Sequence, residues 1–144
     1  MVAPVPLPDE KVGDASERLR QTDAWLKVFE DHMPGYKTMH PMSPHDIEEE
    51  SLLMDRSFVS GMWQCHFYAP DYLFWMRQYD HTKVYEELKL WLQLMQYQTP
   101  GRSQKKWILK ASTHALGGNL RTAMNAFPEA KVIMTHRRME DVLV

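Results

Sequence analysis

The sequence predicts an α/β fold in which short parallel strands, at about 106–111 and 131–135, join a large helical portion. Both segments are short apolar runs. Between them, apolar side chains recur at helical spacing, at Leu116, Leu120 and Met124. A strand, a helix and a second strand within about 30 residues form a βαβ unit, which implies parallel pairing and a right-handed crossover.

Length and composition describe one globular domain with little charge bias. The chain has 144 residues, 44% of them apolar and 25% charged, and a formal net charge of −2. This near-neutral balance argues against a nucleic-acid partner, and no apolar run reaches the ~18 residues of a membrane span. Cys65 is the only cysteine, which excludes an internal disulfide. No secretory signal pattern is visible, so the sequence favours the cytoplasm.

The first expected helix spans 14–31 and follows a proline-rich arm at 1–13. Prolines at alternate positions keep the arm extended. Asp14 or Ser16 can cap the helix, and Pro34-Gly35 ends it.

A second helix is expected at 44–56. Pro44 suits the first helical position, and the acidic run 46–50 suits the positive end of the helix dipole. His45 and Glu49 have the i,i+4 spacing of a metal-ligand pair, but a helix start explains the acidic residues better. We therefore expect no metal site.

Further helices are expected at 71–79, 83–98 and 116–127. The strongest pattern belongs to 83–98, in which apolar residues follow one helical stripe: Val84, Leu88, Trp91 and Met95. Pro100-Gly101 ends this helix. The aromatic residues upstream, from 58 to 79, suit either a helical core or an apolar pocket.

Basic residues and histidines follow both expected strands. Lys110 and His114 lie at the carboxyl end of the first strand, and His136 and Arg137 lie at that of the second. Ligands of open α/β sheets bind beyond the carboxyl ends of the strands, so these residues suit an anionic ligand. Each of them alone is equally compatible with a solvated loop charge.

These segments resemble the core of the bacterial-type sulfotransferase family. The resemblance rests on Trp107-Ile108-Leu109-Lys110-Ala111-Ser112-Thr113-His114 and on Phe127-Pro128-Glu129-Ala130, followed by an apolar run and Thr135-His136-Arg137. Three upstream segments extend it: the proline-rich residues 4–8, the acidic residues 44–53 and the aromatic residues 70–75.

The resemblance implies a P-loop-type three-layer fold that transfers a sulfuryl group from 3′-phosphoadenosine 5′-phosphosulfate to a small hydroxyl or amine acceptor, without a metal. His114 matches the base that deprotonates the acceptor, Lys110 a lysine near the transferring group, and Arg137 the arginine that holds the donor's 3′-phosphate. Residues 14–104 would form the acceptor side and 105–144 the nucleotide side. Four residues are candidates for acceptor contact: Trp63, His66, Phe67 and Trp75.

Two parts of the family's donor site have no counterpart in these 144 residues. They are the glycine-rich loop that holds the 5′-phosphosulfate and a serine that partners the arginine. The resemblance thus implies a single incomplete domain, truncated at both ends and inactive alone. The alternative is a non-catalytic helical interaction module or an inactive remnant of the scaffold. A small kinase is disfavoured because no Walker A loop is present. Unpaired strand edges would also allow a homo-oligomer.

Overall fold

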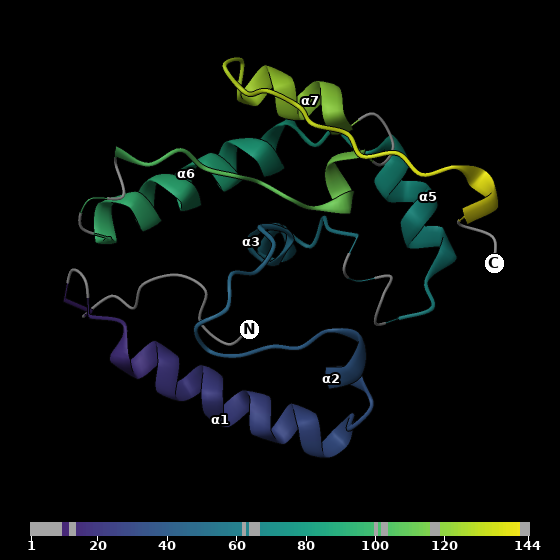
Figure 1. The fold of residues 1–144 in the computed structure, drawn as a ribbon. Helices are drawn as coiled ribbons and strands as arrows, with labels where there is room; N and C mark the ends of the chain where they lie inside the picture. The colour runs from purple at the N-terminus through teal and green to yellow at the C-terminus, as the bar shows by residue number, and fades with distance from the viewer. Residues whose placement is uncertain are drawn as a thin grey trace.

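The computed structural model describes residues 10–11, 14–61, 63, 67–99, 101, 104–115 and 119–141. Its regular elements are helices (Figure 1). The α-helices are α1 (Ser16–His32), α2 (Tyr36–Met39), α3 (Ser51–Met54), α5 (Pro70–Gln78), α6 (Thr82–Gln98) and α7 (Asn119–Ala126). The 3-10 helices are η1 (Asp55–Ser57), η3 (Ser112–Ala115) and η4 (Met139–Asp141).

The predicted α/β class is wrong, because no strand occurs among the described residues. The P-loop-type three-layer architecture and the βαβ unit are wrong with it. Segments 106–111 and 131–135 are irregular, and no main-chain hydrogen bond joins them. An apolar run becomes a strand only where a neighbouring strand satisfies its N–H and C=O groups, and neither segment has such a neighbour in the described part of the chain.

In segment 106–111, inward and outward side chains alternate as in a β-strand, but the segment has no hydrogen-bonded neighbouring strand. Trp107 and Leu109 pack against the helical core, whereas Ile108 between them is 89% exposed. The segment lies along the helices as a single extended chain. In the second segment every residue is exposed.

The core lies between α3, α5 and α6. Its buried members are Leu53, Met54, Val59, Met76, Val84, Tyr85, Leu88 and Leu92. Those on α6 form one stripe at helical spacing, as the sequence predicts. The start of α6 is held by Asp80, whose carboxylate accepts bonds from the Thr82 N–H at 2.9 Å and the Thr82 hydroxyl at 2.6 Å. These bonds lower the pKa of Asp80.

The helix expected at 44–56 begins only at Ser51 and passes into η1 at Asp55. Phe58, with φ 56°, ends η1 in the left-handed region. The hydroxyl of Tyr72 holds this turn: it accepts the Ser60 N–H at 3.1 Å and lies 2.9 Å from the Phe58 carbonyl oxygen, to which it donates. Residues 44–50 therefore run into α3 as irregular chain, which frees their carboxylates for other contacts.

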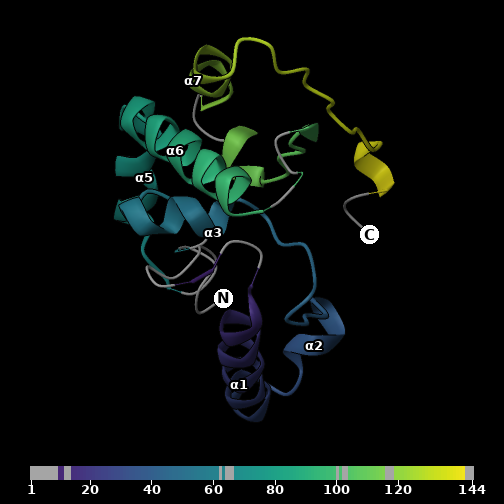
Figure 2. The same cartoon turned by 90° about the vertical axis from the view of Figure 1, so that its left-hand side faces the viewer.

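Helix α1 lies apart from the helices of the core (Figures 1 and 2). Leu26 is its one buried residue. Its surface carries the ion pairs Glu17–Arg20 and Asp23–Lys27, which are solvent-exposed. Such pairs support a helix only weakly, by a few tenths of a kcal/mol each. The apolar face of α1 is therefore only partly covered. None of the described helices is long and apolar enough to cross a membrane.

Candidate functional site

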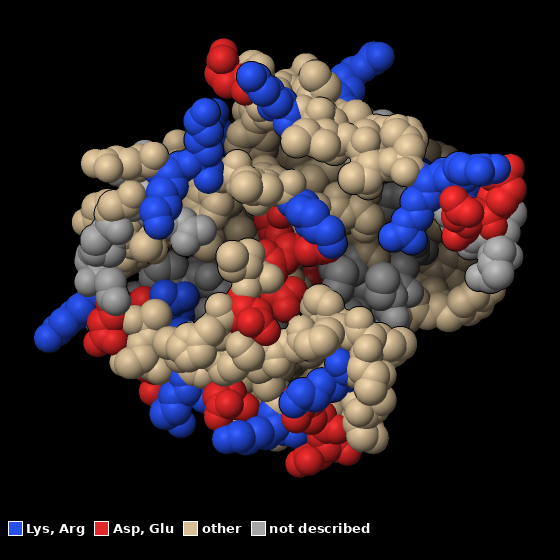
Figure 3. Space-filling model, viewed as in Figure 1, with Lys and Arg blue, Asp and Glu red and all other residues tan. Residues whose placement is uncertain are grey.

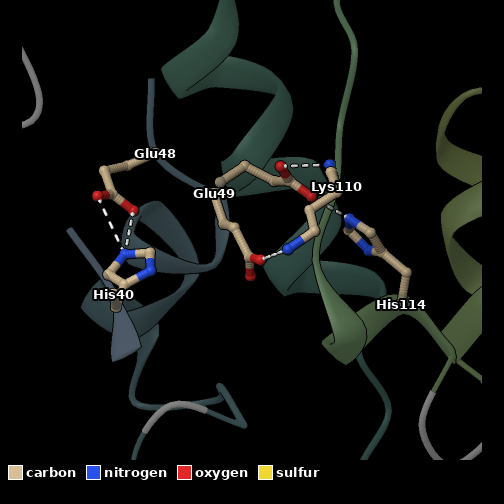
Figure 4. A network of polar contacts seen from close by, with 6 residues as sticks. His40, Glu48, Glu49, Lys110 and His114 are labelled. Carbon is tan, nitrogen blue, oxygen red and sulfur yellow. Dashed lines mark hydrogen bonds and ion pairs between the residues drawn. The ribbon is translucent and has the colours of Figure 1, made fainter. Parts of the chain in front are cut away.

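The three consecutive glutamates before α3 contact two distant parts of the chain, the end of α2 and the segment from Lys110 to His114 (Figure 4). Glu48 pairs with His40 at 3.3 Å, at the end of α2. Glu49 forms an ion pair with Lys110, and Glu50 lies 2.5 Å from Nε2 of His114. On the face of the molecule seen in the space-filling view, acidic side chains gather at the centre, next to a basic side chain (Figure 3). The acidic run, expected to favour a helix start, instead connects distant segments.

Glu50 is buried, with 7% of its surface exposed. Burial raises the pKa of its carboxyl, but the hydrogen bonds from His114 and from the Lys110 N–H outweigh it, so the pKa lies below its ordinary value. The Lys110 N–H bond measures 2.9 Å. Glu50 is therefore ionised at neutral pH.

Both ring nitrogens of His114 are occupied inside the protein. Nε2 faces the Glu50 carboxylate, and Nδ1 lies 2.8 Å from the hydroxyl of Tyr85. A carboxylate only accepts, so Nε2 carries the proton. Burial is the main cause that raises the pKa of Tyr85, and the charge of Glu50 adds to it, so the phenol stays protonated beside Nδ1. A proton-accepting role for His114 would require this network to open, and it stays a prediction.

Lys110 and Arg137, the other two residues with a predicted role at the sulfuryl donor, lie in different surroundings. Lys110 lies beside His114 in this cluster, with its side chain 81% exposed, and Glu49 raises its pKa. Arg137 lies on the exposed segment after α7, where it forms no hydrogen bond or ion pair with the described residues. The predicted roles of both residues are untested.

A second feature is an open cavity of about 530 Å³ between α1, α2 and the residues around α3, which we call the aromatic groove. It is lined by Thr22, Trp25, Leu26, Phe29, Tyr36, His40, Met42, Ser43, Glu48, Leu52, Asp55, Arg56, Trp63 and Phe67. Its volume lies within the usual range of ligand pockets, about 300–1,000 Å³.

The rings of the aromatic groove support one another. Trp25 stacks on Phe29 with centroids 5.0 Å apart, and Phe29 meets Tyr36 edge to face, also at 5.0 Å. Elsewhere in the lining, Trp63 stacks on Phe67 with centroids 6.0 Å apart. Rings in such contact keep a fixed orientation, so the groove presents a preformed apolar surface.

The predicted acceptor contacts divide between the groove and its surroundings. Trp63 and Phe67 line the groove. Trp75 lies on α5, where it packs against Tyr79 at 4.8 Å and is not among the lining residues. His66 lies outside the described residues. The contribution of α1 to the groove was not predicted from the sequence, although Trp25 and Phe29 at i,i+4 signal an aromatic helix face.

In the part of the chain that the structure describes, no three His, Cys, Asp or Glu residues are grouped to hold a metal ion. No protein-family model, curated protein or solved structure matches this chain. The resemblance to sulfotransferases consequently stays a prediction from the sequence.

Proposed function

We propose that this chain is a non-catalytic helical interaction module, which binds an apolar segment of a partner protein in the aromatic groove. The observation that carries the proposal is the groove itself: about 530 Å³ of open, aromatic-lined space beside a helix whose apolar face is only partly covered. Large aromatic side chains contribute much of the binding energy of protein interfaces because they bury a large area at a small entropic cost.

The spacing of residues on α1 favours a protein segment. Thr22, Trp25, Leu26 and Phe29 lie at positions i, i+3, i+4 and i+7, and all four line the groove. They form one helix face over two turns, about 10 Å long. Grooves of this kind take the anchor side chains of an amphipathic segment. A partner residue seated between Trp25 and Trp63 would complete packing that the chain alone leaves open.

The polar cluster supports the non-catalytic part of the proposal. Glu50, His114 and Tyr85 bond to one another, and Glu49 pairs with the Lys110 ammonium. Groups that satisfy one another inside a fold stabilise it, and they act on a substrate only after those bonds break. As part of the same proposal we place the module in the cytoplasm, where a protein with one cysteine loses nothing by lacking disulfides.

A matched pair of tryptophan variants tests the proposal. Trp25 and Trp75 are both on helices, are 36% and 46% exposed, and each packs against a neighbouring ring. Only Trp25 lines the groove. A displayed library of random peptides is selected on the wild-type protein, and the peptides are titrated against Trp25→Ala and Trp75→Ala.

We expect the selected peptides to carry aromatic or long aliphatic anchors. Trp25→Ala should weaken their binding at least tenfold, or about 1.4 kcal/mol. Trp75→Ala should change it less than twofold. Peptides that bind both variants equally, or a library that yields no binder, would contradict the groove as a peptide site. Sulfuryl transfer by the purified chain would contradict the non-catalytic assignment.

A further inference from the structure

The segment that follows α7 is fully exposed. Every residue from 128 to 141 is exposed, including Val132 at 49%, Ile133 at 91% and Met134 at 57%. The segment stands away from the helices as a single arm (Figure 2). Contiguous apolar residues in such a position mark an interaction surface more often than isolated ones do.

The main chain of this arm has free hydrogen-bonding groups. The Ala130 N–H bonds the Phe127 carbonyl at 2.9 Å, and the Asp141 N–H bonds the Arg138 carbonyl at 3.1 Å. Between these bonds, the N–H groups of residues 131–137 have no partner among the described residues. Val, Ile and Thr favour extended backbone, so the arm is suited to pair with another strand.

We propose that residues 129–137 pair antiparallel with the same residues of a second copy of this chain, around a two-fold axis at Ile133. The charges favour this antiparallel arrangement over a parallel one. It sets Glu129 opposite Arg137 and Lys131 opposite Thr135, whereas a parallel in-register pairing would set Lys131 on Lys131 and Arg137 on Arg137. Opposite charges across a strand pair stabilise it, and like charges destabilise it.

The register also agrees with the bonds already present. In an antiparallel pair, every second residue exchanges hydrogen bonds with its opposite number. If Ile133 pairs with its own copy in this way, then Glu129, Lys131, Thr135 and Arg137 do so too, and Ala130 keeps its bond to Phe127. Pro128, which has no N–H, ends the pairing at a turn. Because both copies use the same edge, this pairing closes as a dimer, and the N–H groups of Val132, Met134 and His136 face solvent on the outer edges.

Sedimentation equilibrium of the whole chain tests the pairing. A two-stranded ribbon is marginally stable alone, so we expect a weak dimer whose fraction rises between about 1 μM and 1 mM, not a constant mass. Ile133→Lys should weaken association at least tenfold. Ile108→Lys is the matched control, because Ile108 is equally exposed, at 89%, on the other irregular apolar segment, and it should leave association unchanged.

Charge reversal tests the register itself. Arg137→Glu sets two glutamates opposite each other and should weaken the dimer. Adding Glu129→Arg should restore it, because the pair is then reversed and again complementary. A monomer at all concentrations, species larger than a dimer, an equal effect of the two isoleucine variants, or a double variant that fails to recover would overturn the proposal. Dimers that form through another surface would give one of these last two results.

Discussion

We expect the buried Glu50–His114–Tyr85 network to stabilise the fold more than a surface ion pair does. Two adjacent glutamates allow the comparison. Glu50 is buried and accepts two hydrogen bonds, from His114 Nε2 and from the Lys110 N–H. Glu49 pairs with a lysine side chain that is 81% exposed. Glu50→Gln and Glu49→Gln are the same chemical change in the two environments.

The expected costs differ because burial differs. In Glu50→Gln the amide oxygen can accept one of the two bonds, now without charge assistance, for a loss of about 1 kcal/mol. The amide NH2 faces the other donor, and a buried donor without a partner costs about 1–3 kcal/mol more. The total is about 2–4 kcal/mol. Glu49→Gln removes a solvent-exposed ion pair and should cost about 0–1 kcal/mol.

Urea and thermal unfolding measure both variants. For a domain of this size, about 1 kcal/mol corresponds to about 3 °C in Tm, so Glu50→Gln should lower Tm by about 6–12 °C. Glu49→Gln should lower it by less than about 3 °C. Equal destabilisation by the two variants would refute the reasoning, because it would mean that the network contributes no more than a surface pair.

Three further predictions follow from the same geometry and from the sequence resemblance. The pKa of Glu50 is lowered in the folded state from the ordinary value of 4.5, so its contribution to folding stability is fully present above pH 4.5 and is lost as the pH falls through the folded pKa. The difference in unfolding free energy between wild type and Glu50→Gln, measured with urea, should therefore shrink below pH 4.5. A difference independent of pH would count against this prediction. Tyr72→Phe removes the hydroxyl that holds residues 58–60 and should cost about 1–2 kcal/mol while speeding proteolysis after η1, with Tyr79→Phe as the control. A non-catalytic module should show no thermal shift with 3′-phosphoadenosine 5′-phosphate; a shift that Arg137→Ala abolishes would favour the sulfotransferase instead.

A helix could be predicted from the sequence where one of its faces packs against other parts of the same chain, because its apolar residues then recur at helical spacing. Val84, Leu88 and Leu92 form the buried stripe of α6, and periodicity alone locates them. The expected helices 14–31, 71–79 and 83–98 correspond to α1, α5 and α6. The two strands were predicted wrongly, since local β preference in Val132 and Ile133 does not supply the neighbouring strand that a ladder needs.

The site was harder to predict because its contacts are non-local. His114 and Lys110 were singled out from the sequence, but their partners Glu49 and Glu50 lie more than sixty residues upstream in a run that a helix dipole explains equally well. Tyr85 has the spacing of a core residue, and nothing in its neighbours along the chain signals a bond to a histidine. Trp63 and Phe67 were singled out from the sequence as acceptor contacts because aromatic residues are dense there; both line the groove, and that role stays a prediction.

The Glu48–Glu50 run also has a consequence for how the chain folds. Its pairs with Lys110 and His114 close loops of 61 and 64 residues, whereas α6 forms from local contacts. Loop closure of that length is entropically costly, so we expect residues 105–115 to dock after α6 has packed on α3, with low φ-values at His114. One residue inserted between Glu48 and Glu50 would change the spacing that sets these carboxylates opposite His40, Lys110 and His114. This short connection should be the least tolerant of insertions in the chain, although it contains no regular secondary structure.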